Sequence, residues 1–186
     1  MTVYISLLRG INVAGQKVIK MADLRALYEK LSFENVQSYI QSGNVLFTSS
    51  STEVSNCSQH AEKIQRAICA HYQFQVPVFV LTPDTLQNAR ANLPFEHIDV
   101  AIDGSKVLLC FLSQTPSNSI ELLTPYLKDN EHLAIIGEVL YLYCEEGYGR
   151  SKLSHATIEK KLQVNATSRN LKTIEKLIAL AAESLG

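Results

Sequence analysis

The sequence has no tryptophan and no C-x-x-C motif, and no apolar run reaches the length of a membrane-spanning helix. Its four cysteines are scattered and have no adjacent histidine pair, a spacing that favours buried free thiols over a zinc site or a disulfide framework. No charged segment precedes the first apolar run, as it would in a secretory signal. We therefore expect a cytoplasmic protein that binds no metal and has no membrane partner.

An excess of charge of either sign is also lacking. The 186 residues include 17 Lys+Arg and 18 Asp+Glu, for a formal net charge of -1, and 46% of them are apolar. This balance is typical of a globular chain that can bury a sizeable core, and it argues against intrinsic disorder. It also argues against a protein that binds nucleic acid through a global positive charge.

Hydrophobic periodicity in the first 82 residues predicts the order β-α-β-β-α-β, which is that of the split βαβ, ferredoxin-like unit. A hairpin turn is expected at Gln41-Ser42-Gly43-Asn44, because Gly and Asn tolerate the positive φ of tight turns. A capping box at Ser50 and Glu53 predicts the start of the second helix. The expected strands are Val3 to Leu8, Asn35 to Ile40, Val45 to Thr48 and Val76 to Leu81, and the first helix is Met21 to Leu31.

The same order recurs after a connecting helix, Pro83 to Ala91, and a linker over residues 92–105. Strands are expected at Lys106 to Ser113, His132 to Ile136 and Val139 to Cys144, with helices at Ser117 to Lys128, Ser151 to Leu162 and Asn170 to Leu185. No fourth strand is predicted. The expected fold is therefore α+β, a tandem duplication of a ferredoxin-like unit with antiparallel sheets. Residues 1–91 form the first copy, and residues 106–186 form a degenerate second copy with a C-terminal helix.

The loop from Arg9 to Lys17 joins a strand to a helix, where backbone N–H groups can hold an anion. It has neither the G-x-x-x-x-G-K-[ST] nor the G-x-G-x-x-G phosphate motif, and we expect no cofactor. The candidate ligand-binding residues here are Arg9, Gly10, Asn12 and Lys17. The alternative is that the glycines only serve the backbone geometry of the loop.

A second candidate region lies in residues 147–176, which carry seven basic and two acidic side chains, a net +5 against -6 for the remainder. Arg150 and Arg169 are expected at or just before helix N-termini, where a cation opposes the helix dipole unless an anion lies nearby. Together with Lys152 and Asn170 they complete the set of candidate ligand-binding residues. The alternative, a solvated basic helix face, explains Lys160, Lys161 and Lys176 well but explains Arg150 and Arg169 poorly.

The expected strand topology determines which segments of the chain can form one site. We expect the Arg9 loop and the Gln41–Asn44 turn at opposite ends of the first sheet, so that the two could meet only across the units. The resulting hypothesis is a small anionic ligand, phosphate- or nucleotide-like, bound between the two units.

Three segments of the chain resemble the bacterial domain-of-unknown-function 1697 family. They are LLRGINVAGQKVIKMADLRALYEKLSFENVQSYIQSGNVLF from Leu7, GRSKLSHATIEKKL from Gly149 and ATSRNLKTIEKL from Ala166. The resemblance extends over essentially the whole chain and implies tandem ferredoxin-like units without an established activity. Ile19 and Leu171 differ from the pattern, which commonly has proline and tryptophan there.

Three other functions remain open from the sequence. A single-stranded nucleic-acid-binding module could stack bases on Tyr141 and Tyr143, which alternate on one strand face. An enzyme could use Ser42, Tyr148 or His155, although these residues form no recognisable catalytic constellation. A structural or partner-binding protein would show a large exposed apolar patch or an open sheet edge. The sequence indicates no catalytic residue, no ligand identity and no oligomeric state.

Overall fold

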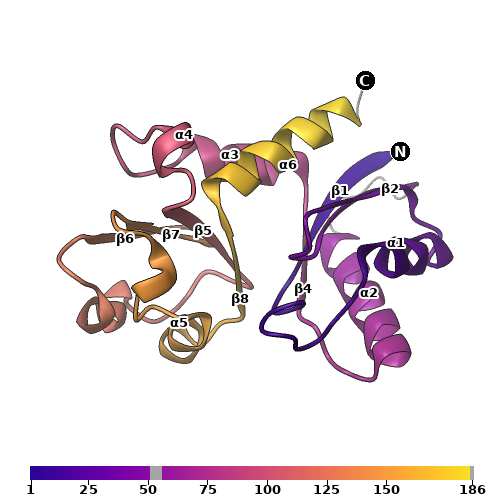
Figure 1. Cartoon of the computed structure of the whole chain (residues 1–186), viewed down its shortest axis with the longest axis horizontal. Coiled ribbons are helices and arrows are strands. Elements are labelled where there is room, and N and C mark those ends of the chain that lie inside the picture. The colour runs from indigo at the N-terminus through magenta and orange to yellow at the C-terminus, as the bar shows by residue number, and fades with distance from the viewer. Residues whose placement is uncertain (51–55, 185–186) are drawn as a thin grey trace. The chain divides into compact units, whose positions relative to one another are not determined.

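A computed structural model describes residues 1–50 and 56–184 as an α+β protein with two four-stranded antiparallel sheets and their helices (Figure 1). The chain divides into two compact units. Unit 1 comprises Met1–Leu86 and Leu177–Gly186, and unit 2 comprises Gln87–Lys176. The division between Leu86 and Gln87 falls within a helix and not within residues 92–105.

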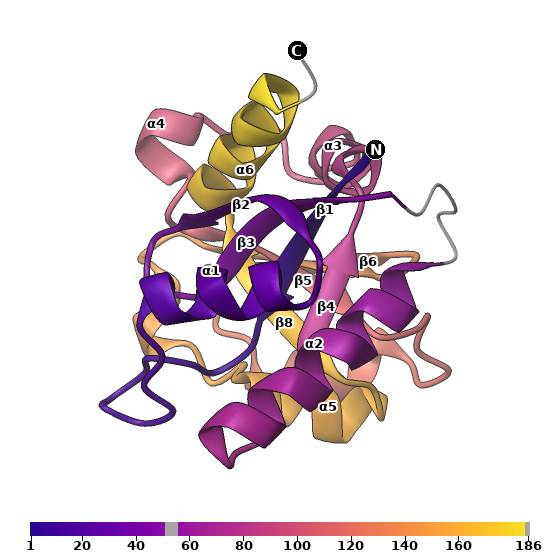
Figure 2. The same ribbon diagram turned by 90° about the vertical axis from the view of Figure 1, so that its right-hand side faces the viewer.

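Unit 1 contains its six predicted elements in the predicted order. They are β1 (Thr2–Leu8), α1 (Met21–Lys30), β2 (Glu34–Tyr39), β3 (Asn44–Ser49), α2 (Asn56–Tyr72) and β4 (Val78–Leu81). The strand order is β2-β3-β1-β4, with every neighbouring pair antiparallel. Helices α1 and α2 cover one face of this sheet (Figure 2). The predicted turn between β2 and β3 is confirmed, whereas the capping box lies outside the described residues because it includes Glu53.

The core between this sheet and its helices is rich in aromatic rings. Tyr4, Phe33 and Phe47 pack against the imidazole of His60, with ring centroids 4.7, 5.1 and 5.8 Å away. All four side chains are buried. Burial lowers the pKa of His60 because the charged imidazolium would lose its hydration, and the positive charge of Lys63 adds a smaller effect in the same direction.

Unit 2 follows the same order of elements, and its strand order is β6-β7-β5-β8. Its elements are β5 (Val107–Leu112), the 3-10 helix η1 (Ile120–Tyr126), β6 (Glu131–Ile136), β7 (Val139–Cys144), the 3-10 helix η2 (Tyr148–Arg150), α5 (His155–Leu162) and β8 (Ala166–Asn170). The α-helix predicted over residues 117–128 is thus a shorter 3-10 helix. It contains Pro125, which has no N–H to donate within an α-helix.

The expectation that the second copy lacks its fourth strand is wrong. Ala166–Asn170 forms β8, which pairs antiparallel with β5 from Leu108↔Asn170 to Leu112↔Ala166. The segment is polar and short, so it carries no hydrophobic run that would have indicated a strand. Helix α6 (Leu171–Glu183) begins directly after it.

The predicted linker is also partly structured. Helix α3 (Pro83–Ala91) has the predicted bounds, but residues 92–105 contain the further helix α4 (Val100–Asp103), in which Asp99 accepts a hydrogen bond from Ala101 N at 2.7 Å. The sheet of unit 2 has η1 and α5 packed on one face. On its other face the Tyr141 hydroxyl donates to Ala89 O of α3 at 2.8 Å.

Candidate functional site

Three connections meet at one end of the sheet of unit 1. We call them the loop end: residues 9–20 after β1, residues 40–43 between β2 and β3, and residues 73–77 before β4. Leu8 N donates to Gly43 O at 2.8 Å, and Arg9 N donates to Pro77 O at 2.9 Å, so both other connections contact the end of β1.

This arrangement corrects the expected topology. The Arg9 loop and the Gln41–Asn44 turn lie at the same end of the sheet, within one unit. The reason is that β1 and β3 are antiparallel, with Leu7 opposite Asn44, so the end of β1 lies beside the start of β3.

Gly43 allows the two connections to approach closely. A Cβ atom placed on Gly43 would lie 2.6 Å from Leu8 Cβ and 2.8 Å from Ile11 Cδ1, closer than side-chain carbons pack. Gly43 also has a φ of +77°, in the region that favours glycine. Only glycine satisfies both conditions without displacing its neighbours.

Asn12 bonds to Ile19 near the end of its own loop, before α1, and to the Gln41–Asn44 turn. Its Nδ2 donates to Ile19 O at 3.0 Å and to Gln41 O at 2.8 Å, and its Oδ1 accepts from Ile19 N at 2.9 Å. Its φ of +55° is one that asparagine adopts more readily than most residues. The amide of Asn12, which we expected to contact a ligand, is therefore used within the protein.

Residues 12–17 form a small hairpin that projects from the loop end. Asn12 N donates to Lys17 O at 3.2 Å and Gln16 N to Val13 O at 2.9 Å. Ala14 and Gly15, with φ of +48° and +74°, form the type I′ turn at its tip. Lys17 Nζ donates to Gln75 O at 2.8 Å, which joins the hairpin to the connection before β4.

The loop end is positively charged. Arg9, Lys17 and Lys20 all lie in the first of its three connections, residues 9–20, and none of the three contains Asp or Glu. Lys17 and Lys20 are exposed, and Arg9 is half-buried. The carboxylate of Asp23 lies nearby in the sequence, in the first turn of α1. Arg9 bonds through its backbone N, and Lys17 through its Nζ, to the segment from Gln75 to Pro77, so both residues lie beside this segment.

The N-terminus of α1 adds to this positive character. Its N-cap residue is Lys20, which forms no side-chain capping hydrogen bond. The first N–H groups of a helix have no partner within the helix, and they carry a partial positive charge. Sequence reasoning missed Lys20, although a lysine directly before Met21, where Ser, Thr, Asp or Asn is usual, was a signal.

In unit 2 the predicted residues occupy different environments. Arg150 ends η2 and is exposed, as is Lys152, whereas α5 begins only at His155, with Ser154 as its cap. The expectation that Arg150 lies at a helix N-terminus is therefore wrong. Asn170 caps α6 by accepting from Thr173 N at 2.9 Å, so its side chain also has a structural role.

Arg169 is a buried cation of β8. The residue is 8% exposed, and its Nη1 donates to Ser168 O at 2.8 Å and to Thr167 Oγ1 at 3.3 Å. Burial lowers the pKa of its guanidinium to about 10, because the charged form loses hydration. The convergence of Arg9, Arg150 and Arg169 on one ligand stays a prediction.

Three of the residues considered for other functions, Tyr141, Tyr143 and Ser42, have partners within the protein, whereas Tyr148 is 44% exposed. Tyr141 is 1% exposed, and Tyr143 stacks on His132 with ring centroids 5.7 Å apart, so stacking of a base on either would require rearrangement. Ser42 Oγ accepts from Asn44 Nδ2 at 2.9 Å. Within residues 1–50 and 56–184, no group of three or more His, Cys, Asp or Glu could hold a metal ion, and no helix could span a membrane.

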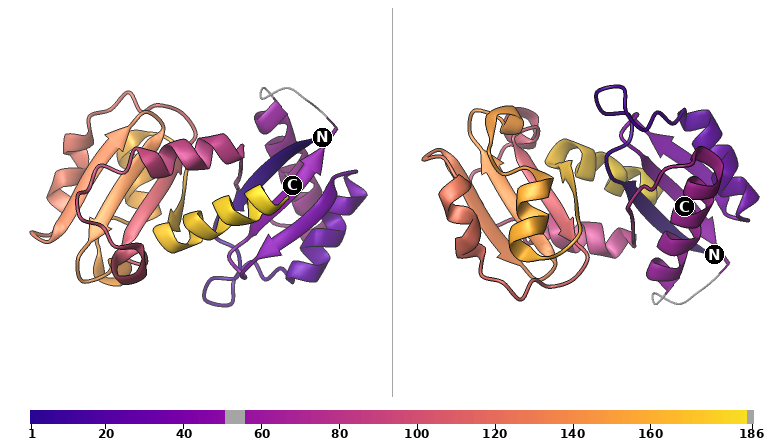
Figure 3. Two further views of the ribbon diagram at one scale, coloured as in Figure 1. Left: turned by 90° about the horizontal axis from the view of Figure 1, so that it is seen from above. Right: turned by 90° about the horizontal axis from the view of Figure 1, so that it is seen from below.

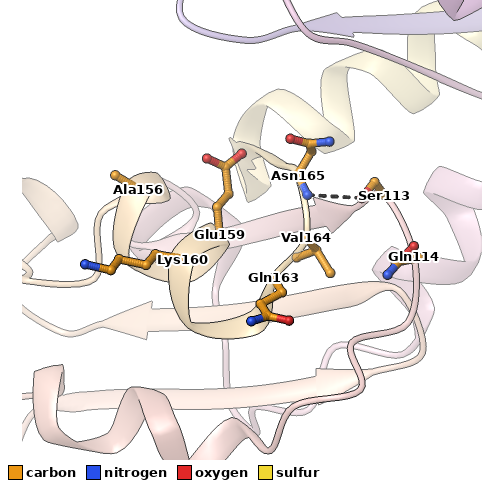
Figure 4. A pocket seen from close by; sticks show the side chains of 8 residues that line it. All are labelled: Ser113, Gln114, Ala156, Glu159, Lys160, Gln163, Val164 and Asn165. Atoms are coloured by element: carbon orange, nitrogen blue, oxygen red, sulfur yellow. Dashed lines mark hydrogen bonds between the residues drawn. The ribbon is translucent and has the colours of Figure 1, made fainter.

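One open cavity of about 550 Å³ lies beside α5 of unit 2 (Figure 4). Its wall includes Glu159 and Lys160, and Asn165 N donates to Ser113 Oγ at 3.0 Å along one side. Glu159 Oε1 accepts from Ala166 N at 2.9 Å. None of the predicted ligand-binding residues lines this cavity, so it does not extend the candidate site.

The fold and the loop end together define an α+β protein of two four-stranded antiparallel sheets with a basic region at one end of the first sheet. The chain belongs to the family described as "Protein of unknown function (DUF1697)", whose model matches residues 1–141. The match confirms the resemblance noted in the sequence and ends before the two C-terminal motifs. No curated protein matches the chain.

A solved structure similar to this chain is that of a conserved bacterial protein, SP0830, from Streptococcus pneumoniae. It is 27% identical in sequence with a TM-score of 0.67, and the alignment covers 97% of this chain and 98% of that one. The similarity thus includes both units.

Proposed function

We propose that the protein binds a small anionic ligand, of the size of a phosphate group or a phosphorylated metabolite, at the loop end of unit 1. The observation that carries the proposal is that Arg9, Lys17 and Lys20 lie in one connection, residues 9–20, and that neither it nor the two connections beside it contain a carboxylate. A positive local potential of this kind attracts anions, and the net charge of -1 for the whole chain disfavours a long polyanion.

The proposed residues have distinct roles. Arg9 presents a planar guanidinium that can hold two oxygens of a phosphate or carboxylate at once, and Lys17 and Lys20 act as point charges. Gly10, with a φ of +68° and no atom within 4 Å of a Cβ placed on it, leaves space for a ligand to approach the backbone. The uncapped N-terminus of α1 supplies N–H groups beside Lys20.

Calorimetric titration with inorganic phosphate and with ATP tests the proposal. Arg9→Ala and Lys20→Ala should each weaken binding about tenfold, because a hydrogen bond to a charged group contributes about 1.5–3 kcal/mol. The matched control is Lys30→Ala at the other end of α1, which should bind as the wild type does. Absence of binding by the wild type at millimolar ligand, or equal loss in the control, would refute the proposal.

The residues of unit 2 test a wider version of the site. Arg150→Ala, Lys152→Ala, Arg169→Lys and Asn170→Ala should weaken the same titration if these residues also contact the ligand. Unchanged affinity in all four variants would restrict the ligand to unit 1.

We also propose that the two units are tandem copies of one ferredoxin-like unit, in a cytoplasmic protein. Equal element order and equivalent strand orders, β2-β3-β1-β4 and β6-β7-β5-β8, support the duplication. Replacement of the first helix by η1 is the main difference between the copies. The four free cysteines are consistent with a reducing compartment.

A second candidate function is partner binding through the same loop end. Val13, Val18 and Ile40 are 61%, 60% and 49% exposed there, and exposed apolar side chains grouped on a monomer often mark an interaction surface. Val13→Ser and Val18→Ser should abolish recovery of a partner in crosslinking without changing anion binding. Loss of anion binding in these variants would refute the assignment of the three residues to a separate partner.

A further inference from the structure

Four strands form the margins of the two sheets, and three of them carry features within the strand or directly before it that hinder pairing with another strand, while β6 carries one only at its first residue. The register of β2 is irregular between Glu34 and Gln37. Strand β4 has four residues and follows Pro77 by one position, and β8 holds the buried charge of Arg169. Bulges, short length, proline and inward-pointing charge are the usual protections of a sheet edge.

Strand β6, at the margin of the sheet of unit 2 (Figures 1 and 3), has one of these protections at its first residue, where the charged Glu131 is 7% exposed, and none of them from His132 to Ile136. Its six residues, Glu131–Ile136, pair with β7 in one regular register and include no proline or lysine. Leu133, Ala134 and Ile135 are half-buried, and Ile136 is 44% exposed. The edge from Leu133 to Ile136 is therefore apolar and regular, and these properties favour addition of a strand.

The hydrogen bonding of β6 shows which backbone groups face outward. Glu145 N donates to Asn130 O at 3.2 Å, so Asn130 is bonded on the β7 side. Bonded and non-bonded residues alternate along an antiparallel pair. Ala134 therefore also faces β7, and the N–H and C=O groups of Leu133 and Ile135 point to the open side.

We propose that β6 pairs antiparallel with β6 of a second copy of this chain, about a two-fold axis at Ala134. This register places Leu133 opposite Ile135 of the partner subunit, and the two residues exchange both of their outward N–H···O bonds. Leu133 and Ile135 both pack toward the core that includes Leu123 and Leu140, so the new cross-strand pairs are apolar.

Self-complementarity favours a second copy over an unrelated peptide. At the axis two Ala134 residues meet as a non-bonded pair, with Cβ atoms about 4.5–5.5 Å apart, which suits a methyl side chain. No Asp, Glu, Lys or Arg occurs from His132 to Ile136, so no like charges meet. The Nε2 atom of His132 lies 2.8 Å from the Oε1 atom of Glu145 in the same chain.

Sedimentation velocity over a concentration series tests this proposal with charge variants at the axis. The wild type should dimerise, and Ala134→Lys should raise the dissociation constant about tenfold or more, because like charges would lie directly opposite each other. An equimolar mixture of Ala134→Lys and Ala134→Glu should recover the dimer. The control is Gln37→Lys, an exposed position on the protected edge strand β2, which should dimerise as the wild type does.

Hydrogen exchange gives a second readout that does not depend on a substitution. The amides of Leu133 and Ile135 should exchange more slowly as the protein concentration rises, whereas the Ala134 amide, bonded to β7, should be protected throughout. A monomer at all concentrations, a dimer insensitive to Ala134→Lys, or failure of the Lys and Glu variants to associate when mixed would each overturn the proposal.

Discussion

Replacement of Gly43 by alanine tests the close contact on which the loop end depends. The added methyl group would meet Leu8 Cβ at 2.6 Å, in a backbone with φ of +77°. The left-handed conformation costs an L-residue about 1–2 kcal/mol. Forcing an extra methyl group into a packed position costs about 1–3 kcal/mol more. We therefore expect Gly43→Ala to lower the free energy of unfolding of unit 1 by about 2–5 kcal/mol.

Gly15→Ala is the matched control for this prediction. Its φ is +74°, but nothing lies within 4 Å of the added Cβ, so only the backbone cost of about 1–2 kcal/mol applies. Urea unfolding followed by far-ultraviolet circular dichroism measures both variants, and the difference between them isolates the steric contact. Equal destabilisation by the two substitutions would refute the close approach of the turn to the end of β1.

Three further predictions concern named side chains. Asn12→Ala should destabilise unit 1 by about 2–4 kcal/mol in urea unfolding, because its three hydrogen bonds to Ile19 and Gln41 are lost, each worth about 0.5–1.5 kcal/mol. The control is Gln16→Ala at an exposed site, and an equal loss of stability in the two variants would contradict the prediction. Asn170→Ala should cost about 1 kcal/mol through loss of the α6 cap, and Asn170→Ser should restore most of it. His60 has a lowered pKa in the folded state, so the unfolded chain binds more protons, and stability should fall as the pH drops below about 6.5. Urea midpoints measured from pH 7.5 to 5 should fall less steeply for His60→Phe than for the wild type. An unchanged pH dependence would mean that other groups cause the loss of stability.

The elements that the sequence predicted well are those with a strong periodic signal. Met21, Leu24 and Tyr28 lie on the buried face of α1, and Pro83 marks the first residue of α3, as its fixed φ favours. Strand β8 was missed because tertiary pairing with β5, and not composition, makes Ala166–Asn170 a strand. Strand formation in such a polar segment depends on partners that are distant in the sequence.

The candidate site was harder to predict because it depends on strand direction. The residues of the Arg9 loop and of the Gln41–Asn44 turn were both identified, but placing them together requires that β1 and β3 be antiparallel. The roles of the asparagines also could not be read from their positions, since Asn12 bonds to Gln41, which is 29 residues away. An amide at a loop or a helix start is equally suited to a ligand and to the backbone of its own chain.

The difference between the helix N-termini gives the basic residues a new interpretation. From the sequence, a cation beside a helix start indicates a bound anion, and this reasoning predicts one near Arg150 and Arg169. In the structure α5 and α6 are capped by Ser154 and Asn170, so those helix dipoles are already compensated locally. At α1 the N-cap residue Lys20 forms no side-chain cap, so the first N–H groups are not satisfied in this way, while Asp23 in the first turn complements the dipole. The physical reason for expecting an anion therefore survives, and it moves from the basic C-terminal segment to the loop end of unit 1.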